Sequence, residues 1–147
     1  MIEIFPLKLE YCEMVAEIAA KCLPEAWSLE SIQDVLRYDN NIYFVARDDK
    51  IGKVVAFAGI MVIVDEAELL NIAVIDGYRG QRIAQRLLNR LITSAVERNA
   101  YRMLLEVRQS NEAARSFYRK NGFHDIGERK RYYSNPIEDA IIMEKLL

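Results

Sequence analysis

Residues 67–96 read AELLNIAVIDGYRGQRIAQRLLNRLITSAV, and the hydrophobic pattern of this stretch changes halfway. Residues 69–75 form an apolar run interrupted only by Asn71, which is typical of a short buried strand. Asp76 and Gly77 then supply turn residues. From Arg79 onward apolar residues recur at helical spacing, and they are Ile83, Ala84, Leu87, Leu88, Leu91, Ile92, Ala95 and Val96. The pattern predicts a buried strand that leads through a turn into a long amphipathic helix.

A strand-to-helix turn of this kind is suited to binding an anion. The first turn of a helix leaves about four backbone N–H groups unpaired, and the helix dipole adds about half a positive charge there. Arg79, Arg82, Arg86 and Arg90 place further positive charge along one side. A solvated basic helix face is the common alternative, and neither G-x-G-x-x-G nor G-x-x-x-x-G-K-[ST] is present. The residues alone therefore predict a phosphate-type anion site and nothing more specific.

Length and composition restrict the class of protein. A chain of 147 residues, 52% hydrophobic and 29% charged, predicts one globular domain. A net charge of −2 and a pI near 5.5 argue against direct nucleic-acid binding. The longest apolar run, residues 54–64, is too short to span a membrane, and the first residues lack a signal peptide, so we expect a cytoplasmic protein without membrane attachment. The composition does not predict an oligomeric state.

The two cysteines and the single histidine argue against a disulfide and against a metal site. Cys12 and Cys22 lie on one predicted helix, where ten residues correspond to about 15 Å, too far for a disulfide. With His124 as the only histidine, a dedicated metal site is not expected.

The whole chain predicts an α/β (mixed α+β) fold. Expected strands are residues 2–7, 42–47, 53–64, 69–75, 101–107, 123–131 and 140–146, and expected helices are residues 10–23, 29–38, the stretch after Arg79, and 112–120. Short connections make the first strands antiparallel, and the helical crossover makes 69–75 and 101–107 parallel. Ser28 is expected to cap the second helix, and Ser110 or Asn111 the fourth. We therefore expect a central mixed, mostly antiparallel sheet of about seven strands, flanked on both faces by about four helices.

Glu106 is unusual because it lies in LLEVR, inside an apolar strand. Burial would raise its pKa above about 4.3 and make it a better proton acceptor near neutral pH. The alternative is that Glu106 lies near an exposed strand end and pairs with Arg102 or Arg108.

Two aromatic residues also allow two interpretations. Tyr118, beside Phe117 in RSFYRKNGF, is either a core residue or a neutral hydroxyl that protonates a developing thiolate. Trp27 is either a packing anchor between the first two helices or a binding residue in a loop. A single histidine disfavours a Ser–His or Cys–His nucleophile.

Several motifs together resemble one family. Residues 79–84, RGQRIA, resemble the acetyl-CoA-binding pattern Gln/Arg-x-x-Gly-x-Gly/Ala of the GNAT superfamily of N-acetyltransferases, with Arg82 at the central glycine. The segments AWS, EAELLNIAV, LLEVRQSNEAARSFYRKNGF and RYYSNPIEDAIIMEKLL resemble the RimI-type enzymes of that family. Those enzymes acetylate the N-terminal alanine of a ribosomal protein, and the resemblance spans almost the whole chain.

The resemblance implies a fold, a set of site residues and a reaction. It implies a GNAT-like sheet splayed between residues 69–75 and 101–107, with Glu106 as general base and Tyr118 as general acid. The acetyl-CoA contacts that it implies are Ile72, Ala73, Val74, Arg79, Gly80, Gln81, Arg82, Ile83, Ala84, Gln85 and Asn111. The acceptor contacts that it implies are Trp27, Tyr132 and Glu138. The acceptor would be the N-terminus of a small-subunit ribosomal protein, with no metal required.

Three questions stay open at this point. The enzyme could instead acetylate lysine side chains or a small amine, or the chain could be a non-catalytic acyl-CoA-binding domain, which the presence of both Glu106 and Tyr118 disfavours. Arg82 is expected to take ordinary helical dihedral angles, with its guanidinium bonding to phosphate. The alternative is that the site needs a glycine-only conformation or more room, in which case the turn must shift and coenzyme affinity falls.

Overall fold

The computed structural model of the protein describes residues 1–24 and 27–147. In this part of the chain the strands form one seven-stranded sheet in the order β1-β2-β3-β4-β5-β7-β6. The strands are β1 (Ile2–Pro6), β2 (Asn41–Asp48), β3 (Lys53–Ile63), β4 (Glu66–Val74), β5 (Arg102–Arg108), β6 (His124–Tyr133) and β7 (Glu138–Leu146). Neighbouring strands are antiparallel except β4 and β5, which are parallel. The predicted mixed sheet is confirmed.

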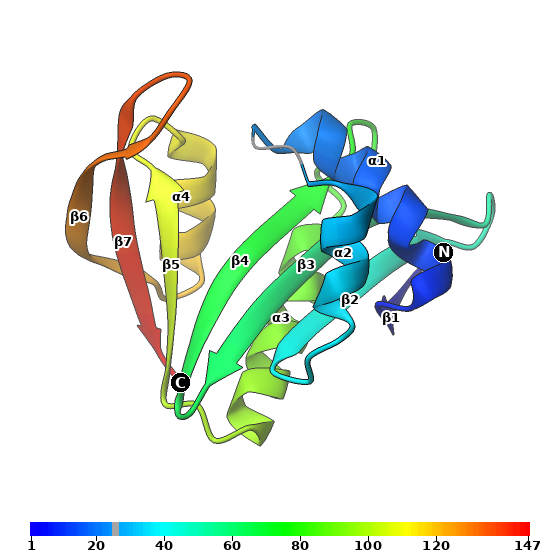
Figure 1. The fold of residues 1–147 in the computed structure, drawn as a ribbon, viewed down its shortest axis with the longest axis horizontal. Helices are drawn as coiled ribbons and strands as arrows, with labels where there is room; N and C mark the ends of the chain where they lie inside the picture. Colours follow the sequence, from blue (N-terminus) through cyan, green and yellow to red (C-terminus); the bar gives the residue numbers. More distant parts are fainter. Residues whose placement is uncertain (25–26) are drawn as a thin grey trace.

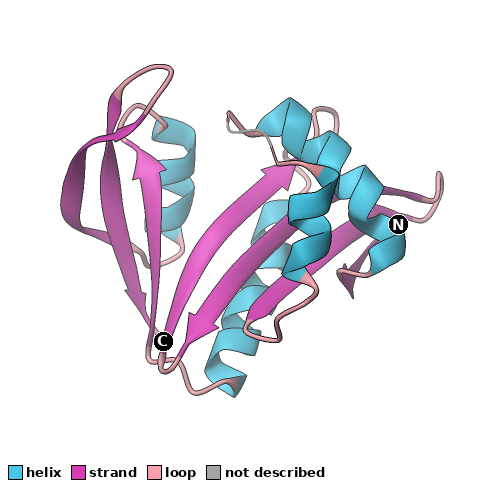
Figure 2. Ribbon diagram, in the orientation of Figure 1, coloured by secondary structure: helices cyan, strands magenta, loops and turns pink. Residues whose placement is uncertain are grey.

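Helices cover both faces of the sheet (Figures 1 and 2). A short 3-10 helix, η1 (Leu9–Tyr11), leads into the first α-helix, α1 (Cys12–Cys22). Helices α1 and α2 (Leu29–Val35) lie on one face of the sheet. Helices α3 (Ile83–Glu97) and α4 (Glu112–Lys120) lie on the other face. Each face has its own core, because β3 is buried along almost its whole length and contributes side chains to both. Among the described residues, none of the helices is both long and apolar enough to cross a membrane.

The sheet forks between β4 and β5. These strands pair only at Glu66↔Arg102, Ala67↔Met103 and Glu68↔Leu104, and beyond that point they diverge (Figure 1). Two ion pairs join three strands at the end where β4 and β5 are paired. Arg102 of β5 pairs with Glu66 of β4 at 2.5 Å and with Glu144 of β7 at 2.7 Å. The fork leaves one edge of β4 unpaired inside the molecule, which matches the splay that the resemblance implied.

Two local features shape β4 and its neighbours. The register shifts after Gly59, which lies opposite Asn71 while Ile60 lies opposite Leu69, so Leu70 is an extra residue in β4. Gly59 is required by packing: a Cβ there would lie 2.2 Å from the ring of Tyr43 on β2. The Tyr43 ring therefore covers Gly59 and reaches Asn71, whose Nδ2 donates to its hydroxyl at 3.3 Å.

The helix caps agree with the sequence, whereas several boundaries do not. Ser28 and Asn111 accept hydrogen bonds from Ser31 N and Ala114 N and cap α2 and α4. The second helix ends at Val35 instead of residue 38, and β6 continues through Tyr133, where a loop was expected from residue 132. The carboxylate of Asp139 accepts Arg131 N at 2.9 Å and so keeps the β6–β7 ends together.

The start of α3 also differs from the prediction. The helix begins at Ile83, and Arg82, its N-cap, has φ 61° and ψ 23°. These are left-handed values, so the expectation of ordinary helical dihedral angles for Arg82 is wrong. The helical periodicity of residues 79–82 misled the prediction, because the chain needs a turn there, with Gly77 and Gly80 also at positive φ, to pass from β4 into α3.

Candidate active site

The unpaired edge of β4 offers backbone groups to a ligand. Ile75 N donates to Val55 O of β3 at 3.0 Å, so by the alternation of an antiparallel ladder Ala73 also bonds toward β3. Ile72 and Val74 then direct their N–H and C=O groups toward the fork. Arg79 Nε already donates to the Val74 carbonyl at 3.1 Å, which leaves the Val74 N–H and both Ile72 groups available. Of the three residues predicted to contact acetyl-CoA here, two have backbone groups that face the open edge.

The N-terminus of α3 is an uncapped, electropositive helix end. Arg82 makes no side-chain cap, and the first turn, which is fully described, carries no acidic residue. The first intrahelical bond is Arg86 N to Arg82 O at 3.0 Å, so the N–H groups of Ile83, Ala84 and Gln85 have no helical partner. This end of the helix therefore suits a phosphate group.

The other residues predicted for coenzyme binding lie around this turn. Arg79 pairs with Asp76 at 3.0 Å, and Gln81 donates to Gly77 O at 3.5 Å. The side chain of Gln85 donates to Asn121 Oδ1 at 2.6 Å and so ties α3 to the end of α4. These side chains are bonded to other groups of the protein and stabilise the turn. The backbone N–H groups are therefore the main donors that a ligand can bind.

Glu106 lies just beyond the last β4–β5 pair, on the face of the sheet opposite α3. Met103, Leu105 and Val107 of β5 pack in the α3-side core, so the alternating residue Glu106 points to the other face. Its side chain is 20% exposed, and Arg129 Nε of β6 lies 2.8 Å from Oε2. The Arg129 N–H is not aimed at the oxygen, so this buried oxygen accepts no hydrogen bond within the described structure.

The partner of Glu106 corrects the sequence analysis. Pairing with Arg102 or Arg108 was the alternative considered, and it is wrong for both. Arg102 binds Glu66 and Glu144, and Arg108 pairs with Glu138 at 3.3 Å. Arg129 was missed because it lies in the exposed strand β6, where the sequence HDIGERKRYY contains several charges and marks none of them.

Glu106 also influences two groups that face it. Burial raises the pKa of Glu68 on β4, and the negative charge of Glu106 raises it further, while Arg129 opposes both effects. The charge of Glu106 is the main reason that the pKa of Tyr132 is raised, followed by burial. Tyr132, a predicted acceptor contact, is half exposed and lies near Arg129, whose guanidinium carbon is 5.9 Å from its ring centre.

Tyr118 projects from α4 with its ring packed in the core. Its ring packs against Phe117 and Phe123, with ring centres 5.6 Å away in each case. Burial raises the pKa of the hydroxyl to about 12, so it stays protonated across the neutral range. Within the described part of the chain the hydroxyl makes no hydrogen bond, so it is free to donate one. Its role as general acid remains a prediction.

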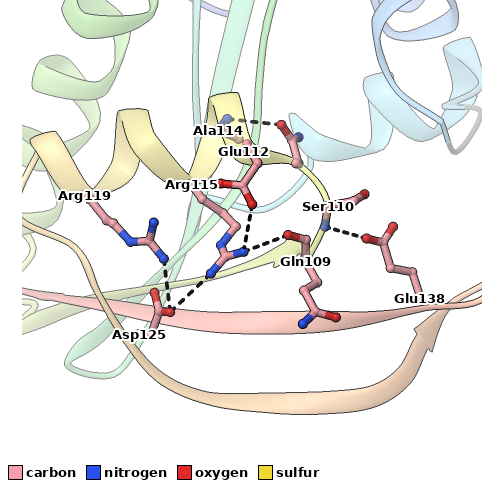
Figure 3. A network of polar contacts seen from close by, with 9 residues as sticks. Gln109, Ser110, Glu112, Ala114, Arg115, Arg119, Asp125 and Glu138 are labelled. Carbon is pink, nitrogen blue, oxygen red and sulfur yellow. Dashed lines mark hydrogen bonds and ion pairs between the residues drawn. The ribbon is translucent and has the colours of Figure 1, made fainter.

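A polar network fixes α4 and the loop before it (Figure 3). Arg115 and Arg119 both reach Asp125 of β6, at 3.6 and 3.3 Å. Asn111, predicted as a coenzyme contact, uses its side-chain oxygen to cap α4. The network therefore fixes the helix from which Tyr118 projects.

Glu138 is engaged within the protein. Its carboxylate accepts a hydrogen bond from Ser110 N at 2.5 Å (Figure 3). It also pairs with Arg108 at 3.3 Å. The neighbouring Asp139 is likewise bonded to Lys130 and to Arg131 N. The predicted contact of Glu138 with an acceptor stays a prediction. Within the protein, the Glu138 carboxylate holds β7 against the end of β5, and the Asp139 carboxylate joins β7 to β6.

Trp27 lies on the same face of the sheet as Glu106. Its ring centre is 6.3 Å from that of Tyr43 on β2, and its side chain packs against the core on the α1–α2 face of the sheet. A binding role for Trp27 stays a prediction. It also lines a hollow of about 360 Å³ with residues of α2 and the start of β2, which are Ser31, Asp34, Val35, Tyr38 and Asn41. Ala26 of the AWS motif lies outside the described residues.

The groups described above form one candidate site. Among residues 1–24 and 27–147, no group of three or more His, Cys, Asp or Glu side chains is placed to hold a metal ion. The arrangement instead combines an anion-binding helix end, an open strand edge, a buried carboxylate oxygen and a protonated phenol. Such a set can hold a phosphorylated, extended ligand and move protons at its end.

Comparisons with known proteins point to one family. The family model described as "Acetyltransferase (GNAT) family" matches residues 12–123. A protein of Bacillus subtilis (strain 168), provisionally named as a ribosomal protein bS18-alanine N-acetyltransferase, is 35% identical over 138 residues, which cover 93% of this chain and 90% of that protein. The enzyme of that name from Escherichia coli (strain K12) is 44% identical over 94 residues, which cover 63% of this chain and 64% of the relative.

A solved structure has the same fold. The crystal structure of the ribosomal-protein-S18-alanine N-acetyltransferase from Escherichia coli superimposes with a TM-score of 0.89 at 32% identity, covering 99% of this chain and 94% of that one. The resemblance stated from the sequence motifs is thereby confirmed.

Proposed function

The chain belongs to the acetyltransferase (GNAT) family, and we propose that it acetylates the N-terminal α-amine of a protein that begins with alanine. Acetyl-CoA is the donor in this family's reaction. The relatives are named for the alanine of ribosomal protein bS18, so the corresponding small-subunit ribosomal protein is the proposed acceptor, modified in the cytoplasm.

The observation that carries this proposal is the fork. It places the open edge of β4 between the uncapped end of α3 and the buried oxygen of Glu106. The coenzyme's pyrophosphate fits the N–H groups of residues 83–85, and its amide-containing arm can pair with the free backbone groups of Ile72 and Val74. The thioester then lies toward Glu106, on the face where Trp27 and Tyr132 flank the approach of a peptide.

The reaction follows as a direct transfer. The acceptor nitrogen attacks the thioester carbonyl, and Glu106 accepts the proton that the nitrogen loses, directly or through a water molecule. The C–S bond breaks as the carbonyl re-forms, and Tyr118 donates its proton to the departing thiolate. The products are the amide and the free thiol, and solvent restores the proton to Tyr118 and removes it from Glu106. No covalent acyl-enzyme is needed.

Proton chemistry favours an α-amine over a lysine. At pH 7.5 about a third of an α-amine with a pKa near 7.8 is neutral, against about one in a thousand for a lysine with a pKa near 10.4. A single carboxylate base therefore gains far more reactive acceptor from an N-terminus.

Turnover with a set of acceptors tests the proposal. Release of coenzyme A should be measured with an alanine-starting peptide, an N-blocked peptide with an internal lysine, a small amine and no acceptor. We expect turnover with the first alone, and its loss in Glu106→Gln. Equal turnover with the blocked lysine peptide would identify a side-chain acetyltransferase, and binding of acetyl-CoA without any turnover would identify a non-catalytic domain.

A further inference from the structure

Asn71 is the only polar residue in the apolar run of residues 69–75, most of which belongs to β4. We propose, on the basis of the function given above, that the side-chain oxygen of Asn71 binds the amino nitrogen of the acceptor and orients it toward the thioester. Asn71 is then a specificity-determining residue for primary amines, and Tyr43 is the residue that positions its amide.

The register of the sheet places Asn71 on the face from which a peptide approaches. Tyr43 of β2 lies opposite Gly59 of β3, and Gly59 lies opposite Asn71, so these three positions share one face of the sheet. Tyr43 is buried in the core on the α1–α2 side. Asn71 therefore points to the α1–α2 side as well, which is the face to which Glu106 points.

Asn71 and Glu106 lie on opposite arms of the fork at a similar depth. The strands β4 and β5 are parallel, and their last pair is Glu68↔Leu104. Two residues further along, Leu70 comes level with Glu106, and Asn71 is the next residue of β4. A thioester held between the arms therefore has Glu106 on one side and Asn71 on the other.

Tyr43 fixes the orientation of the Asn71 amide. Its ring lies directly over Gly59, where a Cβ would be only 2.2 Å from it, so the ring reaches across β3 to β4. The Tyr43 hydroxyl accepts a hydrogen bond from Asn71 Nδ2 at 3.3 Å. Burial raises the pKa of this hydroxyl to about 12, so Tyr43 is a neutral partner across the neutral range. The amide nitrogen is thus turned toward Tyr43, and the amide oxygen is turned away from it.

The side-chain oxygen of Asn71 is available to a ligand. It accepts no hydrogen bond from any described residue. The described side-chain atoms that are both enclosed and unpaired are Glu106 Oε2 and Arg115 Nε, so Asn71 Oδ1 is open to solvent on a partly buried side chain. A carboxamide oxygen is a hydrogen-bond acceptor only, and it can therefore accept an N–H of the amine at every stage of the reaction.

The reaction gives the two hydrogens of a neutral primary amine different fates. As the N–C bond forms and the C–S bond breaks, one hydrogen leaves as a proton to Glu106, and Tyr118 gives its own proton to the thiolate. The other hydrogen stays on the nitrogen of the product amide. Asn71 Oδ1 accepts a hydrogen bond from this retained hydrogen and itself gains or loses no proton. With one hydrogen directed to each arm of the fork, the nitrogen lone pair points at the thioester carbon between them.

A peptide that begins with N-methylalanine tests this arrangement. Its neutral amine has a single hydrogen, which Glu106 must take, and a methyl group in place of the hydrogen that Asn71 would bind. We measure kcat/KM for this peptide and for the matching alanine peptide, with the wild-type protein and with Asn71→Leu. The variant should lose about 2–12-fold with the alanine peptide, since one hydrogen bond contributes about 0.5–1.5 kcal/mol and 1.4 kcal/mol is tenfold. It should lose nothing with the N-methylalanine peptide, so the preference for alanine should shrink by the same factor.

Tyr43→Phe is the matched control, because it keeps the ring over Gly59 and removes only the hydroxyl that holds the amide. With the alanine peptide it should lower kcat/KM by less than Asn71→Leu does, and in the Asn71→Leu background it should have no further effect. Thermal unfolding and the affinity for acetyl-CoA, which should be unchanged, show that each variant is folded. Equal losses with both peptides in Asn71→Leu, no loss with either, or an independent loss from Tyr43→Phe in the double variant would overturn the role of Asn71, since a purely structural residue does not distinguish the two amines.

The same measurement distinguishes failure of the proposed function. If the protein acetylates lysine peptides and not alanine peptides, the α-amine specificity is wrong. The comparison of a lysine peptide with its Nε-methyllysine counterpart then decides the role of Asn71 separately, because the two hydrogens of that amine have the same fates. Absence of turnover with every acceptor overturns both proposals.

Discussion

Replacing Arg82 by glycine is expected to stabilise the fold and, at low salt, to weaken the binding of acetyl-CoA. Arg82 holds left-handed dihedral angles at the N-terminus of α3, where its side chain forms no cap. A left-handed conformation costs a non-glycine residue about 1–2 kcal/mol. A cation at a helix N-terminus costs about 0.3–1 kcal/mol more in the absence of an anion.

The expected gain is smaller than the sum of these costs, because glycine also loses more freedom on folding. That opposing term is about 0.5–1 kcal/mol. The net stabilisation should be about 1 kcal/mol, which corresponds to a rise in Tm of about 3 °C for a protein of this size. The backbone N–H groups of residues 83–85 remain in place, so any loss of affinity comes from the guanidinium charge and should shrink at high salt.

Arg82→Ala is the matched control, since it removes the same charge and keeps a Cβ at the strained position. Glycine should exceed alanine in free energy of unfolding by about 1 kcal/mol, while calorimetry should give both variants the same salt-dependent loss of acetyl-CoA affinity. A glycine variant no more stable than the alanine variant would refute the strain argument. Tighter binding of acetyl-CoA by the glycine variant would show that Arg82 obstructs the site.

Four further substitutions test other parts of the structure. Glu106→Gln should lower kcat by about 10²–10⁴-fold with little change in acetyl-CoA affinity, because it removes the proton acceptor and keeps the shape. Tyr118→Phe should slow turnover while the Tm changes little, since the ring packing is kept. Gly59→Ala should cost about 1–3 kcal/mol of stability, because its Cβ would meet the ring of Tyr43. Glu68→Gln should raise the Tm at pH 7.5, because folding raises the pKa of the Glu68 carboxyl and so disfavours its ionised form. The gain in stability of the variant over the wild-type protein should disappear as the pH falls through that raised pKa toward about 4.5, where the carboxyl is protonated in both the folded and the unfolded state.

Each of these predictions has a contrary result. An unchanged kcat in Glu106→Gln would return that residue to a purely structural role. Unfolding of Tyr118→Phe with unchanged specific activity of the folded fraction would make Tyr118 a core residue only. A stable Gly59→Ala would mean that the Tyr43 ring moves freely, and a stability gain of Glu68→Gln that persists below pH 4 would not come from its charge.

Much of the fold was predictable because its signals are local. Alternating and helical hydrophobic patterns located the strands and helices, and Ser28 and Asn111 marked helix starts by their capping chemistry. The fork was reached only through the resemblance, since the point at which two parallel strands separate depends on packing between distant segments. The left-handed Arg82 was missed because an arginine gives no local sign of that conformation.

The sequence indicated single residues of the candidate site but not their arrangement. Glu106 stands out in the sequence as a charge within an apolar strand. The ion pairs of Arg129 with Glu106 and of Glu138 with Arg108 could not be predicted from the sequence, because each depends on how β6 and β7 fold back against β5. Ion pairs between strands far apart in sequence follow from the tertiary register, which local patterns do not contain.

A competition experiment on one peptide determines which amine the protein acetylates. A single peptide with a free N-terminal alanine and an internal lysine is incubated with the protein and acetyl-CoA at pH 7.5, and fragment mass spectrometry locates the acetyl group. We predict acetyl on the alanine nitrogen, formed by the wild-type protein and not by Glu106→Gln. Acetyl on the lysine side chain, or equal labelling of both amines, would contradict it.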